Sequence, residues 1–167
     1  MGNQIFAYVD GIPTKGLWID MDIIDTWDEI KSKLVEGGYC TEEYGGDILV
    51  ADAEGLCRPF VSRYGSFDLS AFVECRDHKT HAPDEAKITY VAWMGSWDSQ
   101  GFEDRYVGDY SDEINPLRAY VENYIEETGM LNDMPKNLRW YFDTEKFARD
   151  MELNGDIYEE DGFIFYS

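Results

Sequence analysis

Alternating hydrophobic and polar positions at the start of the chain predict a β-hairpin. Residues 5–9, with the sequence Ile-Phe-Ala-Tyr-Val, form a first candidate strand, and residues 16–21 form a second one. Gly11 and Pro13 lie between the two strands and favour a turn. Residues 47–51 are expected to return as a third strand.

A helix is expected after the hairpin. Thr26 followed by Glu29 is the signature of a capping box, in which two side chains satisfy free amide groups at the start of a helix. Ile30 and Leu34 follow at helical spacing, and Gly37 ends the pattern. The first part of the chain is therefore predicted to combine a small sheet with one helix.

The middle of the chain has a helical pattern in two places. Residues 67–74 and 85–94 are expected to form helices, separated by the polar stretch 77–84 with Pro83 inside it. The second helix competes with another interpretation, because residues 88–91, Ile-Thr-Tyr-Val, also suit a strand.

A longer amphipathic helix is predicted after Asn115. Asn115 is a good cap, Pro116 suits the first turn, and Gly129 ends the pattern. The apolar positions between them recur at helical spacing and predict one buried face. These positions are Leu117, Tyr120, Val121, Tyr124 and Ile125.

The C-terminal end predicts one more helix and a second hairpin. Asp143 is placed to cap a helix that contains Phe147, Ala148 and Met151. The dipeptide Asp161-Gly162 separates two short apolar runs, which is a strong signal for a two-residue type I′ turn.

These elements predict an α+β fold of two to three small subdomains. We expect an N-terminal sheet-plus-helix unit at residues 1–63 and a mainly helical connecting unit at residues 64–98. Residues 99–167 are expected to form a C-terminal α+β unit.

Charge is the strongest compositional signal. The chain has 35 acidic and 14 basic residues, a formal net charge of −21, yet 44% of its residues are hydrophobic and 16% aromatic. It therefore has the apolar content to fold, which a disordered acidic segment lacks. Such a body repels nucleic acids and anionic lipids and attracts basic proteins. The functional interpretation is a basic partner, although a halophilic origin also produces such acidity.

The acidity rises toward the C-terminus. Residues 98–167 hold 18 acids and 6 bases, a net charge of −12 (6 − 18). Glu122 and Glu126 are four residues apart on a predicted helix, where like charges are unfavourable. A solvated helix face explains such a pattern as well as a binding surface does. The candidate partner-binding acids are Asp109, Asp112, Glu113, Glu122, Glu126, Glu127, Asp143, Glu145 and Asp150.

Signals for other chemistry are weak. Cys40, Cys57 and Cys75 form no CxxC pair and fit reduced, partly buried thiols better than a disulfide framework. Residues 75–84 carry ligand-type side chains at a spacing that matches no zinc pattern. Motifs for a nucleophile or a phosphate loop do not occur, so we expect no catalytic residues, no metal and no cofactor.

Neither a membrane segment nor an export signal is predicted. No apolar run reaches the roughly 18 residues of a membrane span. Residues 1–10 lack the basic and apolar regions of a secretory signal. We therefore expect a cytoplasmic protein.

Four blocks of sequence resemble the ArdA family of antirestriction proteins and come in that family's order. The likeness is close over residues 102–167 and thinner upstream, where residues 8–20 and 52–55 carry it. The blocks are EDRYVGDY at 103–110, YIEETG at 124–129, PKNL at 135–138 and WYFDTEKFARDM at 140–151.

This resemblance implies a non-enzymatic DNA mimic encoded on mobile genetic elements. Such a protein occupies the DNA-binding channel of type I restriction-modification enzymes, at the core of specificity and modification subunits, and blocks restriction and also modification. It implies an elongated homodimer and no direct binding of nucleic acid. The alternative function is an acidic chaperone or binding module for basic nucleic-acid-binding proteins.

The family's antirestriction motif maps onto residues 138–151. The resemblance implies structural roles for its aromatic and apolar residues, which are Trp140, Tyr141, Phe142, Phe147 and Met151. The resemblance also implies that Asp143, Glu145 and Asp150 are available to face the partner enzyme. A unit this acidic is expected to meet a second copy through an apolar patch, with Phe142, Phe147 and Met151 as the candidates.

Overall fold

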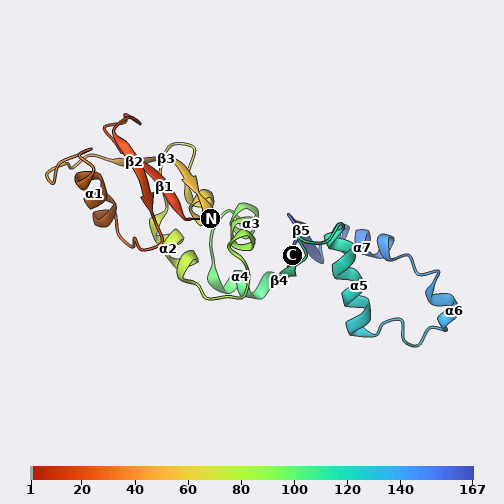
Figure 1. Cartoon of the computed structure of the whole chain (residues 1–167). Coiled ribbons are helices and arrows are strands. Elements are labelled where there is room, and N and C mark those ends of the chain that lie inside the picture. Colours follow the sequence, from red (N-terminus) through yellow and green to blue (C-terminus); the bar gives the residue numbers. More distant parts are fainter. Residues whose placement is uncertain (1) are drawn as a thin grey trace. The chain divides into compact units, whose positions relative to one another are not determined.

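The computed structural model describes residues 2–167, and the chain divides into two compact units, Met1–Ser99 and Gln100–Ser167 (Figure 1). Both units mix helices with a small antiparallel sheet, so the predicted α+β class is confirmed. The division into three subdomains stays a prediction. The first unit contains β1 (Gln4–Val9), β2 (Gly16–Asp20), α1 (Trp27–Glu36), β3 (Ile48–Glu54), the 3-10 helix η1 (Gly55–Phe60), α2 (Leu69–Asp77) and α3 (Asp84–Met94).

The sheet of the first unit has the strand order β2-β1-β3, and both strand pairs are antiparallel. Alternate residues of β1 are buried because successive side chains of a strand point to opposite faces. Helix α1 covers the buried face, to which it contributes Ile30 and Leu34 (Figure 1). The strand side chains buried on that face are Ile5, Ala7, Val9, Ile19 and Val50.

Thr26 and Glu29 cap α1, as the capping-box signature predicts, but Glu29 accepts the amide of Asp25 instead of that of Thr26. The Thr26 hydroxyl accepts a hydrogen bond from the Glu29 amide at 3.2 Å, and it donates to the Glu29 carboxylate at 3.0 Å. The same carboxylate accepts a bond from the backbone amide of Asp25. The predicted hairpin, third strand and helix are all present in the first unit.

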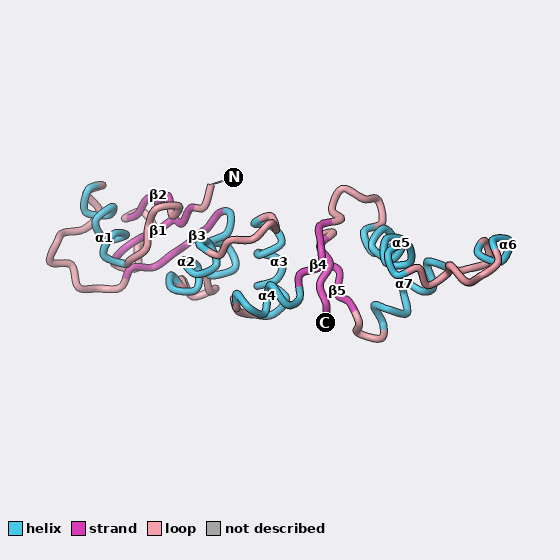
Figure 2. The backbone as a smooth tube through the Cα atoms, turned by 90° about the horizontal axis from the view of Figure 1, so that it is seen from below, coloured by secondary structure: helices cyan, strands magenta, loops and turns pink. Residues whose placement is uncertain are grey.

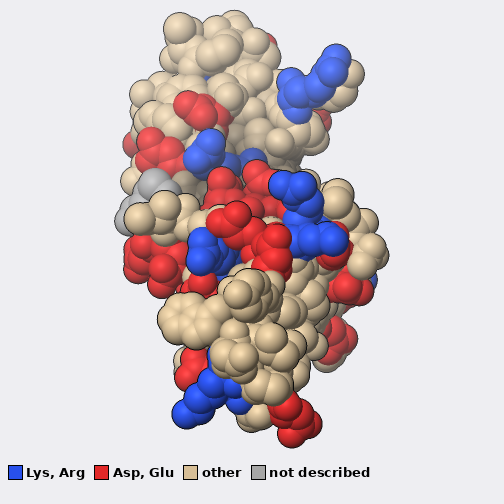
Figure 3. All heavy atoms as spheres, turned by 90° about the vertical axis from the view of Figure 1, so that its right-hand side faces the viewer, with Lys and Arg blue, Asp and Glu red and all other residues tan. Residues whose placement is uncertain are grey.

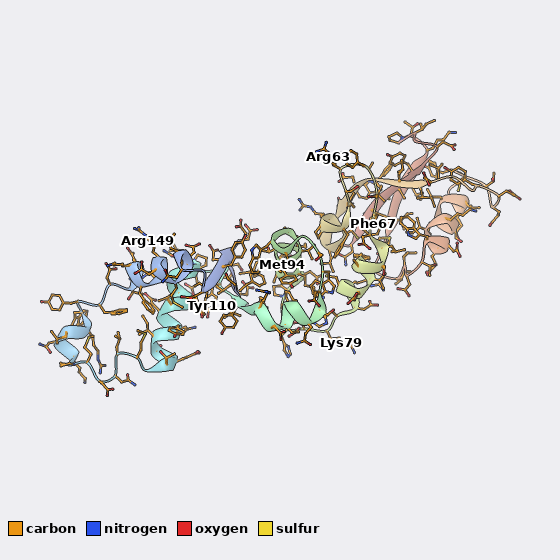
Figure 4. The ribbon with its side chains drawn as sticks, turned by 180° about the vertical axis from the view of Figure 1, so that it is seen from behind. Arg63, Phe67, Lys79, Met94, Tyr110 and Arg149 are labelled. Atoms are coloured by element: carbon orange, nitrogen blue, oxygen red, sulfur yellow. The ribbon has the colours of Figure 1, made fainter. Side chains whose placement is uncertain are left out.

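Residues 88–91 are helical, which decides between the two interpretations of the middle segment. They lie in α3, and Gly95 ends this helix in a left-handed conformation with φ 81°. Helix α2 begins at Leu69. Asp68 caps it, because its carboxylate accepts a hydrogen bond from the Ala71 amide. The preceding Phe67 turns into the interior of the unit, where it contacts Phe72 (Figure 4).

Two cations of this unit hold backbone carbonyls together. Lys87 is only 3% exposed, and its ammonium donates to the carbonyl oxygens of Cys75 and His78 at the end of α2. The Arg76 guanidinium donates to the carbonyl oxygens of Met21 and Ile24, which fixes the chain between β2 and α1. These charges therefore join elements that are distant in the sequence.

The second unit contains α4 (Ser99–Arg105), β4 (Tyr106–Asp109), α5 (Pro116–Thr128), α6 (Lys136–Arg139), α7 (Thr144–Leu153), β5 (Ile157–Glu160) and β6 (Phe163–Tyr166). The first residue of α4, Ser99, is still part of the first unit. The sheet of the second unit has the order β4-β6-β5. Helices α5 and α7 pack against one core with the sheet, and the buried members of that core are Tyr120, Val121, Ala148, Ile157 and Ile164.

The predicted caps at the starts of α5 and α7 and the predicted turn of the second hairpin are confirmed. Asn115 caps α5 through a bond from the Arg118 amide, and Asp143 caps α7 through a bond from the Lys146 amide. Asp161 and Gly162 both have positive φ, 54° and 89°, as a type I′ hairpin turn requires. The sequence pattern missed η1, α4, β4 and α6.

The segment between α5 and α7 extends away from the core of the second unit. It contains only the four-residue helix α6, and Figures 1 and 2 both place it beyond the ends of α5 and α7. Arg139 holds its loop by donating to the carbonyl oxygens of Asn132 and Met134. The first half of the antirestriction motif therefore lies outside the packed core.

Candidate acidic interaction surface

The candidate acids of α5 lie on its solvent side. Leu117, Tyr120 and Val121 turn toward the core, which leaves Glu122, Glu126 and Glu127 exposed. Glu122 pairs with Arg118 one turn earlier, with 2.9 Å between the carboxylate oxygen and Nε. Within the described chain, Glu126 and Glu127 form no ion pair.

The acids before α5 are also exposed. Asp109 ends β4, and its carboxylate accepts hydrogen bonds from the amide and hydroxyl groups of Ser111. Asp112 and Glu113 follow in the loop that leads to the helix. Tyr110 lies between Asp109 and Asp112 in the sequence, and its ring packs against Tyr120 and the core (Figure 4). The loop thus presents its acids outward while the aromatic residue anchors it.

The three candidate acids of the motif have different surroundings. Asp143 is exposed but is held as the cap of α7. Glu145 pairs with Arg118, with 3.0 Å between Oε1 and Nη1. Asp150 has no ion-pair partner among residues 2–167, and Arg149 beside it projects from α7 (Figure 4).

A groove with a volume of about 300 Å³ is lined by side chains of α5 and α7. Arg118 and Arg149 line it together with Glu145 and Glu152, so its charges are mixed. Figure 3 likewise shows Lys and Arg side chains interspersed among the acidic ones on the surface. The candidate surface is acidic in sum, but basic side chains are part of it.

Two aromatic residues of the motif do not have the structural role that was expected. Trp140 is 89% exposed and Tyr141 is 84% exposed, because both follow α6 on the segment outside the core. The periodicity of the motif gave no sign of this, since α7 begins only at Thr144. Exposed aromatic side chains of this size are typical of protein contacts.

The proposed dimer residues have internal contacts. Phe147 packs against Phe142, with 5.6 Å between ring centroids, and against Tyr124 on α5. Phe147 and Met151 are both partly buried against the core of the second unit. Their outer surfaces remain accessible, so the dimer contact stays a prediction.

The three cysteines are free thiols. Cys57 and Cys75 are fully buried, and burial raises the pKa of each thiol from 9.0 to about 12. His78 packs its ring against Trp97. Among residues 2–167, no three His, Cys, Asp or Glu side chains come together in a way that holds a metal ion.

A family model described as antirestriction protein (ArdA) matches residues 5–165. The chain belongs to this family. The match includes the N-terminal unit, where the sequence likeness was thin. ArdA proteins are non-enzymatic DNA mimics that inhibit type I restriction enzymes. No curated protein sequence matches the chain significantly, and no helix among residues 2–167 has the length and apolar character of a membrane span.

Proposed function

We propose that this ArdA chain enters the DNA-binding channel of a type I restriction-modification enzyme in place of the duplex. It binds the methyltransferase core, formed by specificity and modification subunits, and blocks modification as well as restriction. The observation that carries this proposal is the exposure of all the candidate acids, most of them without an ion-pair partner in the described chain.

The amount of charge supports competition with DNA. Duplex DNA carries one charge per about 1.7 Å of axis, so the net charge of −21 equals that of about 36 Å of duplex. Lys and Arg side chains that hold phosphates can bind carboxylates in the same way. The chain therefore offers the enzyme the ligand chemistry of a short DNA segment.

The spacing on α5 supports the same proposal. Glu122 and Glu126 are four residues apart, a rise of about 6 Å along the helix. Alternate phosphates of one DNA strand are about 6.8 Å apart along the axis. A row of basic side chains arranged for a DNA strand would therefore find carboxylates at a similar interval.

We further propose a homodimer that forms through the motif segment. Phe142, Phe147 and Met151 remain candidates, and the exposure of Trp140 and Tyr141 adds these two residues. An apolar contact lets two strongly acidic chains associate despite their repulsion. We place the protein in the cytoplasm, where the enzyme meets incoming DNA.

Competition for labelled DNA tests the function. The chain is titrated into a purified type I methyltransferase core that holds a labelled duplex. We expect displacement at stoichiometric amounts, together with loss of methylation. Retention of the duplex at a large excess of the chain would refute the proposal. Equal binding to several unrelated basic proteins would instead favour the acidic chaperone.

A further inference from the structure

The outer face of the N-terminal sheet carries an aromatic row. Phe6 of β1 lies directly opposite Trp18 of β2 on one side and opposite Asp52 of β3 on the other. Directly opposed residues share a face of an antiparallel sheet, and this face is the one that α1 does not cover. The row therefore reads Trp18, Phe6, Asp52 across the three strands.

A second, acidic row lies beside it on the same face. Gln4 is opposite Asp20 on β2 and opposite Glu54 on β3. Neighbouring strands are about 4.8 Å apart, and residues two apart on one strand are separated by about 6.8 Å. Asp20 therefore lies within side-chain reach of Trp18, as Glu54 does of Asp52.

These side chains are open to solvent and have free binding capacity. Trp18 is 42% exposed, and its ring meets Phe6 edge to face with 5.7 Å between centroids. Asp20 and Asp52 each use one carboxylate oxygen to accept a nearby backbone amide. In the described part of the chain, neither carboxylate pairs with a Lys or Arg side chain, and Glu54 does not either.

The surface is bounded at one end. The loop that holds Arg63 approaches the Tyr8 end of the sheet, where a Cβ atom on Gly65 would lie 3.6 Å from the Tyr8 hydroxyl. Arg63 itself projects from this loop and stacks over the Tyr64 ring at 4.9 Å (Figure 4). The open part of the face is therefore the end that carries Trp18 and the acids.

The same unit contains an arginine that contacts both an aromatic ring and carboxylates. The Arg76 guanidinium lies 5.7 Å from the centre of the Phe72 ring while it pairs with Asp25 and Asp77. An aromatic ring, two carboxylates and two backbone carbonyls thus surround the guanidinium of this arginine. The outer face offers the same two kinds of side chain, aromatic rings and carboxylates, to a ligand from outside.

We propose that Trp18, Phe6, Asp20, Asp52 and Glu54 form a contact surface for arginine side chains of a basic protein partner. A guanidinium plane stacks on Trp18 while its N–H groups bind the neighbouring carboxylates. Lysine, a point charge with a strongly hydrated ammonium, fits this arrangement less well. That the partner is a restriction-modification enzyme rests on the function proposed above; the preference for arginine does not.

Binding of hexa-arginine and hexalysine peptides to the full chain tests this surface. Calorimetry at low salt should show tighter binding of hexa-arginine by the wild-type chain. The Trp18→Leu change should lower the affinity for hexa-arginine about two- to fivefold and leave that for hexalysine unchanged. An unchanged ratio of the two affinities would overturn the proposal.

Two matched controls separate this surface from general acidity. Tyr64→Leu removes an exposed aromatic residue elsewhere in the unit and should leave the ratio unchanged. Asp20→Asn with Asp52→Asn should weaken hexa-arginine binding more than Glu42→Gln with Glu43→Gln, which alters the net charge equally. Equal losses in the two double variants would mean that the sheet face has no special role.

The outcomes also distinguish this inference from the proposed function. If the wild-type chain prefers hexa-arginine but fails to displace DNA from the methyltransferase core, the surface stands and the proposed partner is wrong. If Trp18→Leu changes the molecular mass in light scattering and not the peptide affinities, a second copy occupies the face and the arginine proposal fails. Circular dichroism shows whether Trp18→Leu still folds. If it does not, the variant that combines Asp20→Asn with Asp52→Asn tests the same surface.

Discussion

Arg118 of α5 joins this helix to α7, since its Nη1 lies 3.0 Å from Oε1 of Glu145 on α7. Its Nε donates a hydrogen bond to the carboxylate of Glu122 on α5. This cation neutralises two of the acids that are proposed to face the enzyme. The pair is exposed to solvent, so it contributes little to stability. We expect Arg118→Gln to preserve the fold and to strengthen DNA displacement on the order of twofold at low salt.

Lys15→Gln is the matched control for this prediction. Lys15 is a similarly exposed cation that pairs with Asp10 in the N-terminal unit, whereas the candidate acids all belong to the second unit. Its loss changes the net charge equally and should have a smaller effect. Weaker displacement by Arg118→Gln would show that the ion pair, and not the free acids, is what the enzyme recognises.

Inhibition should weaken steeply with salt. Carboxylate contacts to Lys and Arg are screened as phosphate contacts are. Between about 50 and 200 mM salt we expect the apparent affinity for the methyltransferase core to fall on the order of 10²-fold or more. The measurement is the displacement titration repeated at several salt concentrations, and an affinity that stays constant would contradict an electrostatic mimic.

Neutral changes at single acids should have small effects. Glu126→Gln and Glu127→Gln remove exposed carboxylates that have no ion pair within residues 2–167, and each should weaken displacement less than about fivefold. Their combination with Glu122→Gln should give a clearly larger loss. Complete inactivity of one such variant with an intact fold would point to a discrete binding site instead of distributed charge.

The exposed aromatic side chains of the motif segment should control dimer formation. Trp140→Asp places a charge at a position that is 89% exposed, so the fold should tolerate it. We expect light scattering to report a monomer that displaces DNA more weakly, because linked halves bind at a high effective concentration. Ile114→Asp is a control at another exposed apolar residue. A wild-type chain that is monomeric at micromolar concentration and inhibits fully would remove the dimer from the mechanism.

Stability should fall at alkaline pH. Burial raises the pKa of Cys57, Cys75 and Tyr120 to about 12 in the folded chain. The unfolded chain releases these protons from about pH 9, so deprotonation favours unfolding as the pH rises from 9 toward 12. The urea midpoint should therefore be lower at pH 11 than at pH 8. Cys75→Ala should flatten this dependence, because it removes one of the buried groups.

Local chemistry made most elements predictable. Thr26, Asn115 and Asp143 cap helices as their residue types indicate, and Asp161-Gly162 forms the expected turn. These features depend on a few neighbouring residues. Strand β4 was missed because its pairing partner β6 is more than fifty residues away, so only tertiary structure stabilises it.

The acids of the site were predictable as a class but not in their individual roles. Their exposure follows from charge alone. That Glu145 is paired, whereas Asp150 is not, depends on how α5 packs against α7. The sheet surface around Trp18 was missed because its acids and aromatic residues come from three strands and meet only through the register.

Lys87 and the Nη1 group of Arg76 donate to main-chain carbonyl groups, and every residue type has such a carbonyl. Arg76 additionally binds the carboxylates of Asp25 and Asp77. Apart from these two acids, the connections made by Arg76 and Lys87 therefore place few demands on which surface positions are acidic. Substitutions can move carboxylates across the surface while the chain keeps folding. Such a protein is free to adapt its charge pattern to a different restriction enzyme without first redesigning its own interior.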